Sequence, residues 1–234
     1  MYRGIEISPP FFEIGPKAYA YGRDVVDLAR HADSLSREHR VQVILTPQYT
    51  DIAAVAAVVQ RVLVFAQHMD PLEPGRGVGS VLPEAVRAAG AVGVLLNHVE
   101  RRLPRDVLAR TIQRADQVGL ATMVCADDAT DAVAVAALEP NVIIVESPVL
   151  IGGGARDSDE RHAIAATNQA VWRVDPRIRV LHGAGISGAR DVYDVIAAGA
   201  QGTGSSSAIF GAADPPAMLD EMIASVREAW DATH

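Results

Sequence analysis

The chain has 234 residues, of which 49% are hydrophobic and 21% are charged, so it can bury a sizeable core and does not have the composition of a disordered protein. Its formal net charge is −8 and no basic stripe with interleaved aromatic residues occurs, which argues against a nucleic-acid partner. Cys125 is the only cysteine, which excludes an internal disulfide and a thiolate metal cluster, and we expect neither a metal nor a cofactor. Neither an apolar run of membrane-spanning length nor a signal peptide is recognisable, so we expect a cytoplasmic protein with no membrane partner.

Short apolar runs, rich in Val and Ile, alternate with longer stretches of helical period along the chain. Each run is followed by a turn signal, as buried parallel strands would be. The runs span residues 11–14, 41–45, 62–66, 92–96, 121–124, 142–145 and 179–181. An eighth segment, GTGSS at residues 202–206, is too polar and too rich in glycine to be assigned from its pattern alone.

Helical patterns occupy the intervals between these runs. The clearest are residues 104–118, with Pro104 at the first helical position, residues 159–174, and a C-terminal segment entered by Asp214 and Pro215. The residues at helical spacing, which we expect to face the core, are Leu108, Ile112, Ala115 and Val118, then Ile164, Val171 and Val174, and finally Leu219, Met222, Val226 and Trp230.

Eight strand-then-helix units in a chain of this length predict an α/β fold, a single-domain (β/α)8 (TIM) barrel over residues 1–234 with an N-terminal extension at residues 1–10. A doubly wound open sheet is the competing arrangement. In a barrel the functional residues lie at the C-terminal ends of the strands, so the search for a site starts at those positions.

Two strand ends carry basic side chains of interest. Lys17 follows the first strand and is the only lysine among 21 Lys and Arg residues. An exposed, solubilising lysine is the simplest interpretation, but a compact ammonium also suits a phosphate or a developing enolate oxygen better than a guanidinium does. His98 and Glu100 follow the fourth strand, as either a catalytic imidazole beside a carboxylate or a histidine that merely caps a turn.

Glu146 closes the sixth strand in the segment VESPVLIGGG. Its carboxylate follows a fully apolar run, and partial burial there would raise its proton affinity as a general base requires, although a solvated strand-end glutamate fits the pattern as well. Beyond it, apolar residues 149–151 precede three glycines. This is the pattern of a lid that closes to exclude water, or of a merely flexible loop.

The seventh strand ends in LHGAGISG, which contains G-x-G-x-x-G at Gly183, Gly185 and Gly188. The pattern could indicate a dinucleotide-binding turn and hence an NAD-dependent oxidoreductase. That fingerprint normally opens the first βα unit and is followed about twenty residues later by an acidic residue. Here it lies near the C-terminus, and the next strand ends in serines. We therefore interpret it as a phosphate cradle, which with the loop after the eighth strand matches the usual phosphate site of a barrel.

A base, a histidine, a lysine and a phosphate cradle at one barrel mouth fit proton abstraction next to the carbonyl of a small phosphorylated sugar. The segments VFAQHMDPLEPG, VLPEAVRAAGAVGVLLNHVERR, GLATMVCADD, VESPVLIGGG and LHGAGIS, in this order, resemble those of the triosephosphate isomerase family, specifically its short archaeal-type branch. The resemblance runs from about residue 11 to the end of the chain. It implies interconversion of dihydroxyacetone phosphate and glyceraldehyde 3-phosphate through an enediol(ate).

The resemblance also implies a role for each candidate residue. Glu146 would abstract the proton, and His98, kept neutral by a helix N-terminus, would polarise the carbonyl. Lys17, held by Glu100, would neutralise phosphate and enediolate charge. Backbone donors to the phosphate would come from Gly152, Ala184, Gly185, Ser206 and Ser207. The lid would comprise Ser147, Pro148, Val149, Leu150, Ile151, Gly152, Gly153 and Gly154. The family forms homodimers or tetramers of dimers, so we expect a homodimer or homotetramer in which loop 67–82 reaches into the neighbouring subunit.

Several positions depart from the family pattern. The asparagine at the first strand end is Gly15, the serine after the catalytic histidine is Val99, and the threonine at the tip of the interface loop is Val78. The Gly-Thr-Gly of the lid is all glycine, and the usually apolar eighth strand reads TGS and includes Gly204. These changes would remove polar groups and bulk from the substrate pocket around Gly15, Val99 and Gly204.

Three interpretations of these departures stay open. The chain could be a triosephosphate isomerase with neutral drift. It could instead be an isomerase whose pocket is widened for a larger ketose such as a tetrulose phosphate. The third possibility is a phosphosugar-binding homologue with little or no turnover.

Overall fold

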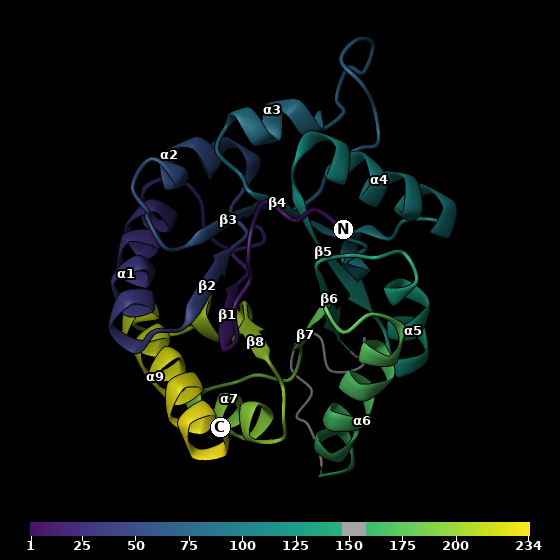
Figure 1. Cartoon of the computed structure of the whole chain (residues 1–234). Coiled ribbons are helices and arrows are strands. Elements are labelled where there is room, and N and C mark those ends of the chain that lie inside the picture. Colours follow the sequence, from purple (N-terminus) through teal and green to yellow (C-terminus); the bar gives the residue numbers. More distant parts are fainter. Residues whose placement is uncertain (147–157) are drawn as a thin grey trace.

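Eight parallel strands form a closed barrel, each joined to the next through helices that lie outside it (Figure 1). This computed structural model describes the backbone of residues 1–146 and 158–234 and the side chains of residues 1–146 and 163–234. The strands are β1 (Phe11–Ile14), β2 (Gln42–Leu45), β3 (Leu63–Ala66), β4 (Gly93–Leu96), β5 (Ala121–Ala126), β6 (Val142–Val145), β7 (Arg179–His182) and β8 (Gly202–Ser205). They pair in chain order, and β8 closes on β1. The predicted barrel is confirmed, and the open-sheet alternative is wrong.

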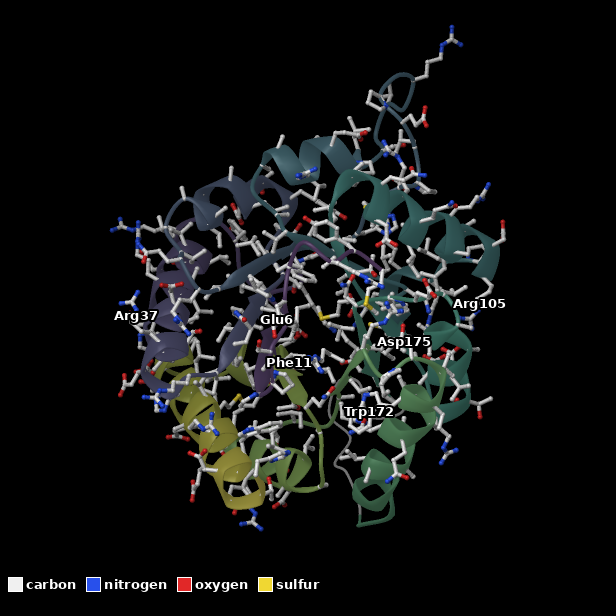
Figure 2. All side chains as sticks on the ribbon, viewed as in Figure 1. Glu6, Phe11, Arg37, Arg105, Trp172 and Asp175 are labelled. Atoms are coloured by element: carbon white, nitrogen blue, oxygen red, sulfur yellow. The ribbon has the colours of Figure 1, made fainter. Side chains whose placement is uncertain are left out.

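An outer ring of helices covers the barrel (Figure 1). Its members are α1 (Arg23–His39), α2 (Ile52–Ala56), α3 (Pro83–Ala88), α4 (Arg105–Val118), α5 (Ala129–Ala136), α6 (Ser158–Val174), α7 (Ala189–Ala197), α8 (Ser207–Phe210) and α9 (Pro215–Thr233), with short 3-10 turns η1 (Tyr49–Asp51) and η2 (Val99–Arg101). Side chains such as Arg37 and Arg105 point away from the barrel, whereas Phe11 lies inside it (Figure 2). No helix in the described part of the chain is both long and apolar enough to cross a membrane.

The helix predictions hold in most details. Helix α9 begins at Pro215, and the side chain of Asp214 accepts a hydrogen bond from the backbone N–H of Ala217 at 3.1 Å, as an N-cap should. Pro104 is the residue before α4 and not its first residue. The expectation that Val174 faces the core is wrong, because Val174 is the last residue of α6 and its side chain is 45% exposed.

The segment that could not be assigned from its pattern is β8, and all four of its residues are buried. Its polar and glycine content is explained by its neighbours. A Cβ atom at Gly202 would lie 2.6 Å from the ring of Phe11, so only glycine fits there. The hydroxyl of Thr203 donates to the backbone carbonyl of His182 at 2.8 Å, which satisfies its buried polar atom.

Residues 1–10 cross the N-terminal end of the barrel (Figure 1). Ile7 is buried and packs with Phe11 and other side chains that fill the barrel interior. Asn141 Nδ2 donates to the carbonyl of Tyr2 at 2.7 Å, and Arg179 Nε donates to the carbonyl of Ile7 at 3.0 Å. Asn141 and Arg179 lie where β6 and β7 begin. The extension therefore covers the face of the barrel formed by the N-terminal ends of the strands, opposite to the face formed by their C-terminal ends.

Candidate active site

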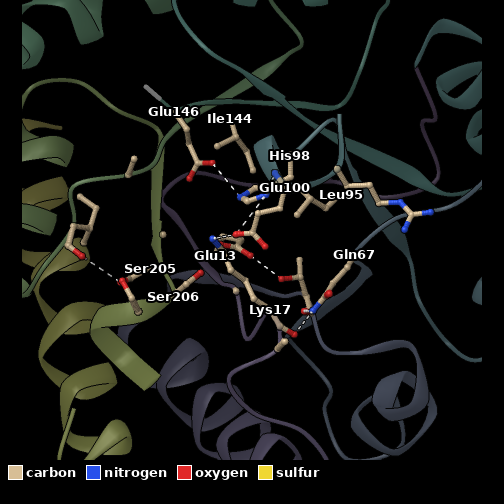
Figure 3. Close-up of a pocket in the computed structure, with 18 of the residues that line it drawn as sticks. Glu13, Lys17, Gln67, Leu95, His98, Glu100, Ile144, Glu146, Ser205 and Ser206 are labelled. Atoms are coloured by element: carbon tan, nitrogen blue, oxygen red, sulfur yellow. Dashed lines mark hydrogen bonds and ion pairs between the residues drawn. The ribbon is translucent and has the colours of Figure 1, made fainter. Parts of the chain in front are cut away.

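A cavity of about 620 Å³ opens at the C-terminal ends of the strands (Figure 3). It is lined by residues of β1, β4, β6 and β8 and by residues that follow β1, β2, β3, β4, β6, β7 and β8. The predicted site residues among them are Gly15, Lys17, His98, Glu100, Glu146, Ala184, Gly185, Gly204, Ser206 and Ser207. The barrel therefore brings together residues that are distant in the sequence.

Lys17 has a backbone conformation that is rare for a residue with a side chain. Its φ is 47°, in the left-handed region, where a non-glycine residue costs on the order of 1–2 kcal/mol. Two amide side chains hold this backbone in place, because Gln48 Nε2 and Gln67 Nε2 donate to the Lys17 carbonyl at 2.5 and 2.9 Å. The ammonium of Lys17 donates to Glu100 Oε1 at 2.8 Å, so the expected Lys17–Glu100 pair is present (Figure 3).

His98 lies at the start of η2, where its side chain serves as the N-cap. Its Nδ1 accepts a hydrogen bond from the backbone N–H of Glu100 at 3.2 Å, so in the neutral ring the proton is on Nε2. Burial lowers the pKa of His98, the positive charge of Lys17 lowers it further, and the carboxylate of Glu100 opposes both. The imidazole is therefore neutral near pH 7, and burial is the largest cause of the lowered pKa.

Glu146 directly follows β6 and points toward His98 (Figure 3). Its Oε2 lies 3.8 Å from His98 Nε2, and the side chain is 20% exposed. Gly183 packs flush against this carboxyl group: a Cβ atom at Gly183 would overlap Glu146 Oε1 and lie 2.9 Å from Glu146 Cγ. The first glycine of the G-x-G-x-x-G pattern thus provides room for Glu146, which the sequence had not suggested.

The predicted phosphate cradle also lines the cavity, and Ser206 lies across it from His98 (Figure 3). Ala184 and Gly185 both line the cavity and have φ values of 60° and 66°, so two successive residues of this turn have a left-handed backbone. Ser206 and Ser207 form the turn after β8, and Ser205 Oγ donates to the carbonyl of Ile186 at 3.4 Å, which joins the two loops. Gly188 immediately precedes α7 and is not among the residues that line the cavity.

Two sets of predicted site residues are not placed in the cavity. Val99 lies in η2 and is not among the residues that line it, so its place in the substrate pocket stays a prediction. The lid residues Ser147, Pro148, Val149, Leu150, Ile151, Gly152, Gly153 and Gly154 lie outside the described residues, and so does the predicted phosphate contact of Gly152.

Glu13 is a cavity residue that the sequence interpretation missed. It lies in β1, where it was counted within an apolar run. Its carboxyl Oε1 accepts a hydrogen bond from Thr46 Oγ1 at 2.8 Å (Figure 3). Burial raises the pKa of Glu13 to about 8, with a smaller contribution from Glu146, against the opposing effects of Thr46 and Lys17. A usable signal existed, because alternation along a strand places residue 13 on the same face as Phe11, inside the barrel.

Glu13 changes how Gly15 and Gly204 are understood. A Cβ atom at Gly15 would lie 2.6 Å from Ser206 Oγ and 3.2 Å from Glu13 Oε1. A Cβ atom at Gly204 would lie 2.7 Å from the Glu13 carbonyl oxygen and 2.9 Å from Glu13 Cβ. The two glycines therefore do not widen the pocket, since Glu13 and Ser206 fill the adjoining space. The sequence interpretation that these positions widen the pocket is therefore corrected.

Comparisons with known proteins agree with this geometry. Residues 16–224 match the family model described as triosephosphate isomerase. The chain is 36% identical to a triosephosphate isomerase of Methanobacterium bryantii, with 88% of this chain and 91% of that protein covered. It is 35% identical to one of Methanosarcina acetivorans, with 93% and 99% covered.

The fold comparison gives the same architecture. A crystal structure of triosephosphate isomerase from Bartonella henselae superposes with a TM-score of 0.71 at 16% identity and covers 91% of this chain and 98% of that one. At that identity the superposition speaks for the fold alone. The family match over most of the chain and the identities to the archaeal proteins together show that the chain belongs to the triosephosphate isomerase family.

Proposed function

We propose that the protein interconverts dihydroxyacetone phosphate and glyceraldehyde 3-phosphate through an enediol(ate). The observation that carries this proposal is the convergence of Glu146, His98 and Lys17 on one cavity, from the ends of three different strands. The Ala184–Gly185 turn lines the same cavity, and we assign it to the substrate phosphate. The family membership of the chain supports the same reaction.

Each side chain is positioned for one part of the chemistry. The Glu146 carboxylate takes the proton from the carbon next to the carbonyl and returns it to the neighbouring carbon. His98 donates from Nε2–H to the substrate oxygens and moves a proton between them, which requires the neutral ring that burial favours. The Lys17 ammonium offsets the negative charge of the enediolate and of the phosphate. Its pairing with Glu100 holds it at the mouth of the cavity.

The cavity does not support an isomerase for a larger sugar such as a tetrulose phosphate. That alternative required room where Gly15 and Gly204 lack side chains, and Glu13 and Ser206 occupy that room. The phosphosugar-binding alternative rested on the missing asparagine at position 15, and no feature of the cavity favours binding without turnover.

A coupled isomerase assay tests the proposed function. Purified protein should turn over glyceraldehyde 3-phosphate with a larger kcat/KM than a tetrulose phosphate. A larger kcat/KM for the four-carbon substrate would make the tetrulose interpretation correct. Tight phosphoglycolate binding without turnover of either sugar would support a binding protein instead.

We also propose that the protein is a homodimer or homotetramer whose contact involves loop 67–82. Residues 73–80 are exposed, and Val78 at the tip is fully so. The loop projects away from the barrel beyond α3 (Figure 1). Two hydrogen bonds between Asp70 and Val81 close the base of the loop. The backbone N–H of Val81 donates to the Asp70 carboxylate at 2.7 Å, and the backbone N–H of Asp70 donates to the Val81 carbonyl at 3.0 Å. An exposed valine at the tip of a well-anchored loop is suited to burial against a second copy.

Light scattering tests the assembly. The wild-type mass should be a multiple of the 24.8 kDa chain, and Val78→Asp should shift the protein toward 24.8 kDa. Val174→Asp, at an exposed valine at the end of α6, is the matched control and should leave the mass unchanged. A monomeric wild type would contradict the proposal.

We place the protein in the cytoplasm because its substrate is a phosphate dianion, which does not cross a bilayer unaided, and cell fractionation tests this.

A further inference from the structure

Glu13 places a second carboxyl group at the floor of the cavity, close to the side chains that carry the proposed reaction (Figure 3). Its register partners are Gly204 on β8 and Ile44 on β2. Thr46 donates to Oε1, and no other described group forms a hydrogen bond with either carboxyl oxygen. A carboxyl group that lines a cavity and has one oxygen free of protein partners is available to a ligand.

The surroundings keep this carboxyl group uncharged near neutral pH. The titratable groups that face it are Lys17 after β1, Cys125 on β5 and Glu146 after β6. Strand β8, with the sequence GTGS, contributes no titratable side chain. Burial and Glu146 outweigh Lys17 and Thr46, so the pKa of Glu13 lies near 8. A neutral carboxyl can donate a hydrogen bond as well as accept one, and such a donor stabilises an oxygen on which negative charge develops.

Glu13 fills the space beside two positions that have no side chain, Gly15 and Gly204. A larger side chain at position 15 would displace the present neighbours, because its Cβ atom would lie 2.6 Å from Ser206 Oγ and 3.2 Å from Glu13 Oε1. Gly204 is confined in the same way by the backbone and Cβ of Glu13. The bulk missing at these two positions is thus replaced by one carboxyl group that rises from a deeper position on β1.

We propose that Glu13 is a substrate-contacting, specificity-determining residue, whose carboxyl group hydrogen-bonds the oxygens at the reacting end of the sugar and makes the contact that a side chain at position 15 cannot make. The inference rests on the proposed function, since it assumes that a phosphorylated sugar occupies the cavity. It adds a fourth polar side chain to Glu146, His98 and Lys17, which carry the proposed reaction. The carboxyl would act as a donor to the carbonyl or enediolate oxygen, with no change in its own protonation during turnover.

Two substitutions test this contact. Glu13→Leu keeps the approximate shape and removes both hydrogen-bonding functions, and we expect it to lower kcat/KM for glyceraldehyde 3-phosphate by about 10²-fold, the usual loss for one preorganised donor. Glu13→Gln keeps a donor and an acceptor and should lose less than about tenfold. Ile44→Val, at the β2 register partner, whose side chain is buried in the barrel interior and does not line the cavity, is the packing control and should change little.

Ligand affinities separate a contact with the sugar from a structural role. Phosphoglycolate carries a carboxylate where the reacting oxygens of the sugar lie, whereas inorganic phosphate reaches only the cradle. Glu13→Leu should weaken phosphoglycolate binding by at least about tenfold and leave phosphate binding within about twofold, the difference expected for one lost hydrogen bond to a charged group. Unchanged phosphoglycolate affinity and kcat/KM, or an equal loss for both ligands, would overturn the proposal. If the wild type turned over no triose phosphate, the proposed function would fail, and the two affinities would still decide the role of Glu13.

The pH dependence supplies an independent measurement. Above the pKa of about 8, Glu13 would ionise beside Glu146, so kcat/KM of the wild type should fall as the pH rises through 8, and Glu13→Gln should lack this fall. In the unfolded chain the carboxyl ionises near 4.5, so the unfolded state binds fewer protons between pH 4.5 and 8. Stability relative to Glu13→Gln should therefore decrease with rising pH over that window and level off above it. A profile identical to that of Glu13→Gln in both measurements would contradict a neutral Glu13.

Discussion

Replacing Glu146 with glutamine is expected to lower kcat by about 10³–10⁴-fold, the upper range for loss of a general base. Glutamine has the same shape and cannot accept the substrate proton. Glu146 Oε2 lies 3.8 Å from His98 Nε2, and the carboxyl group occupies the space that a side chain at position 183 would fill. Steady-state kinetics with glyceraldehyde 3-phosphate measures the loss.

Glu146→Asp is the matched variant for this experiment. It keeps the charge but withdraws the carboxylate by one methylene, and a misplacement of about 1 Å typically costs about 10²-fold. Inorganic phosphate should bind Glu146→Gln as it binds the wild type, because glutamine keeps the shape of the side chain beside Gly183 and leaves the cradle at Ala184 and Gly185 in place. A Glu146→Gln protein within tenfold of wild-type activity would show that another group takes the proton.

Replacing Lys17 with arginine is expected to lower kcat/KM by at least about 10²-fold, although the positive charge is kept. The Lys17 ammonium lies 2.8 Å from Glu100 Oε1 at the cavity wall. A guanidinium is a planar fork with a longer reach, so it cannot place its charge at the same point. The backbone cannot adjust to accommodate it, because Gln48 and Gln67 hold the Lys17 carbonyl in its left-handed conformation.

A matched exchange controls for the substitution itself. Arg40 also has a left-handed backbone, with φ of 54°, but it follows α1 and does not line the cavity. Arg40→Lys should leave kcat/KM unchanged. If Lys17→Arg kept most of the wild-type kcat/KM, the requirement for a compact charge would be wrong, and the single lysine of the chain would have no catalytic explanation.

The barrel could be predicted from the sequence because its strands are buried on both sides and read as continuous apolar runs. The exception was β8, whose Gly202 and Thr203 look wrong for a buried strand. Gly202 is required by the ring of Phe11, and Thr203 by the carbonyl of His182. Both partners are remote in the sequence, so no local pattern reveals them. Val174 was misplaced for a simpler reason, since helical spacing does not tell where a helix ceases to pack.

In the candidate site, too, some residues could be predicted from the sequence and others only from the folded structure. Lys17, His98 and Glu146 could be found because each lies within three residues of the end of an apolar run, and parallel strands in a barrel end on one face. Glu13 was hidden within such a run, and its chemistry depends on burial that only the folded barrel creates. Gln48 and Gln67 act on the Lys17 carbonyl through long-range contacts. The space beside Gly15 and Gly204 was misjudged because a missing side chain says nothing about which neighbour fills its place.

The sequence by itself determined the repeating strand-helix order and the residues that stand at the strand ends, because hydrophobic periodicity and turn residues act over a few neighbouring positions. Only the tertiary structure decided the protonation of Glu13 and His98, the left-handed backbone at Lys17 and the true size of the pocket. These properties depend on desolvation and on contacts between side chains far apart in the chain, and both arise only when the barrel closes.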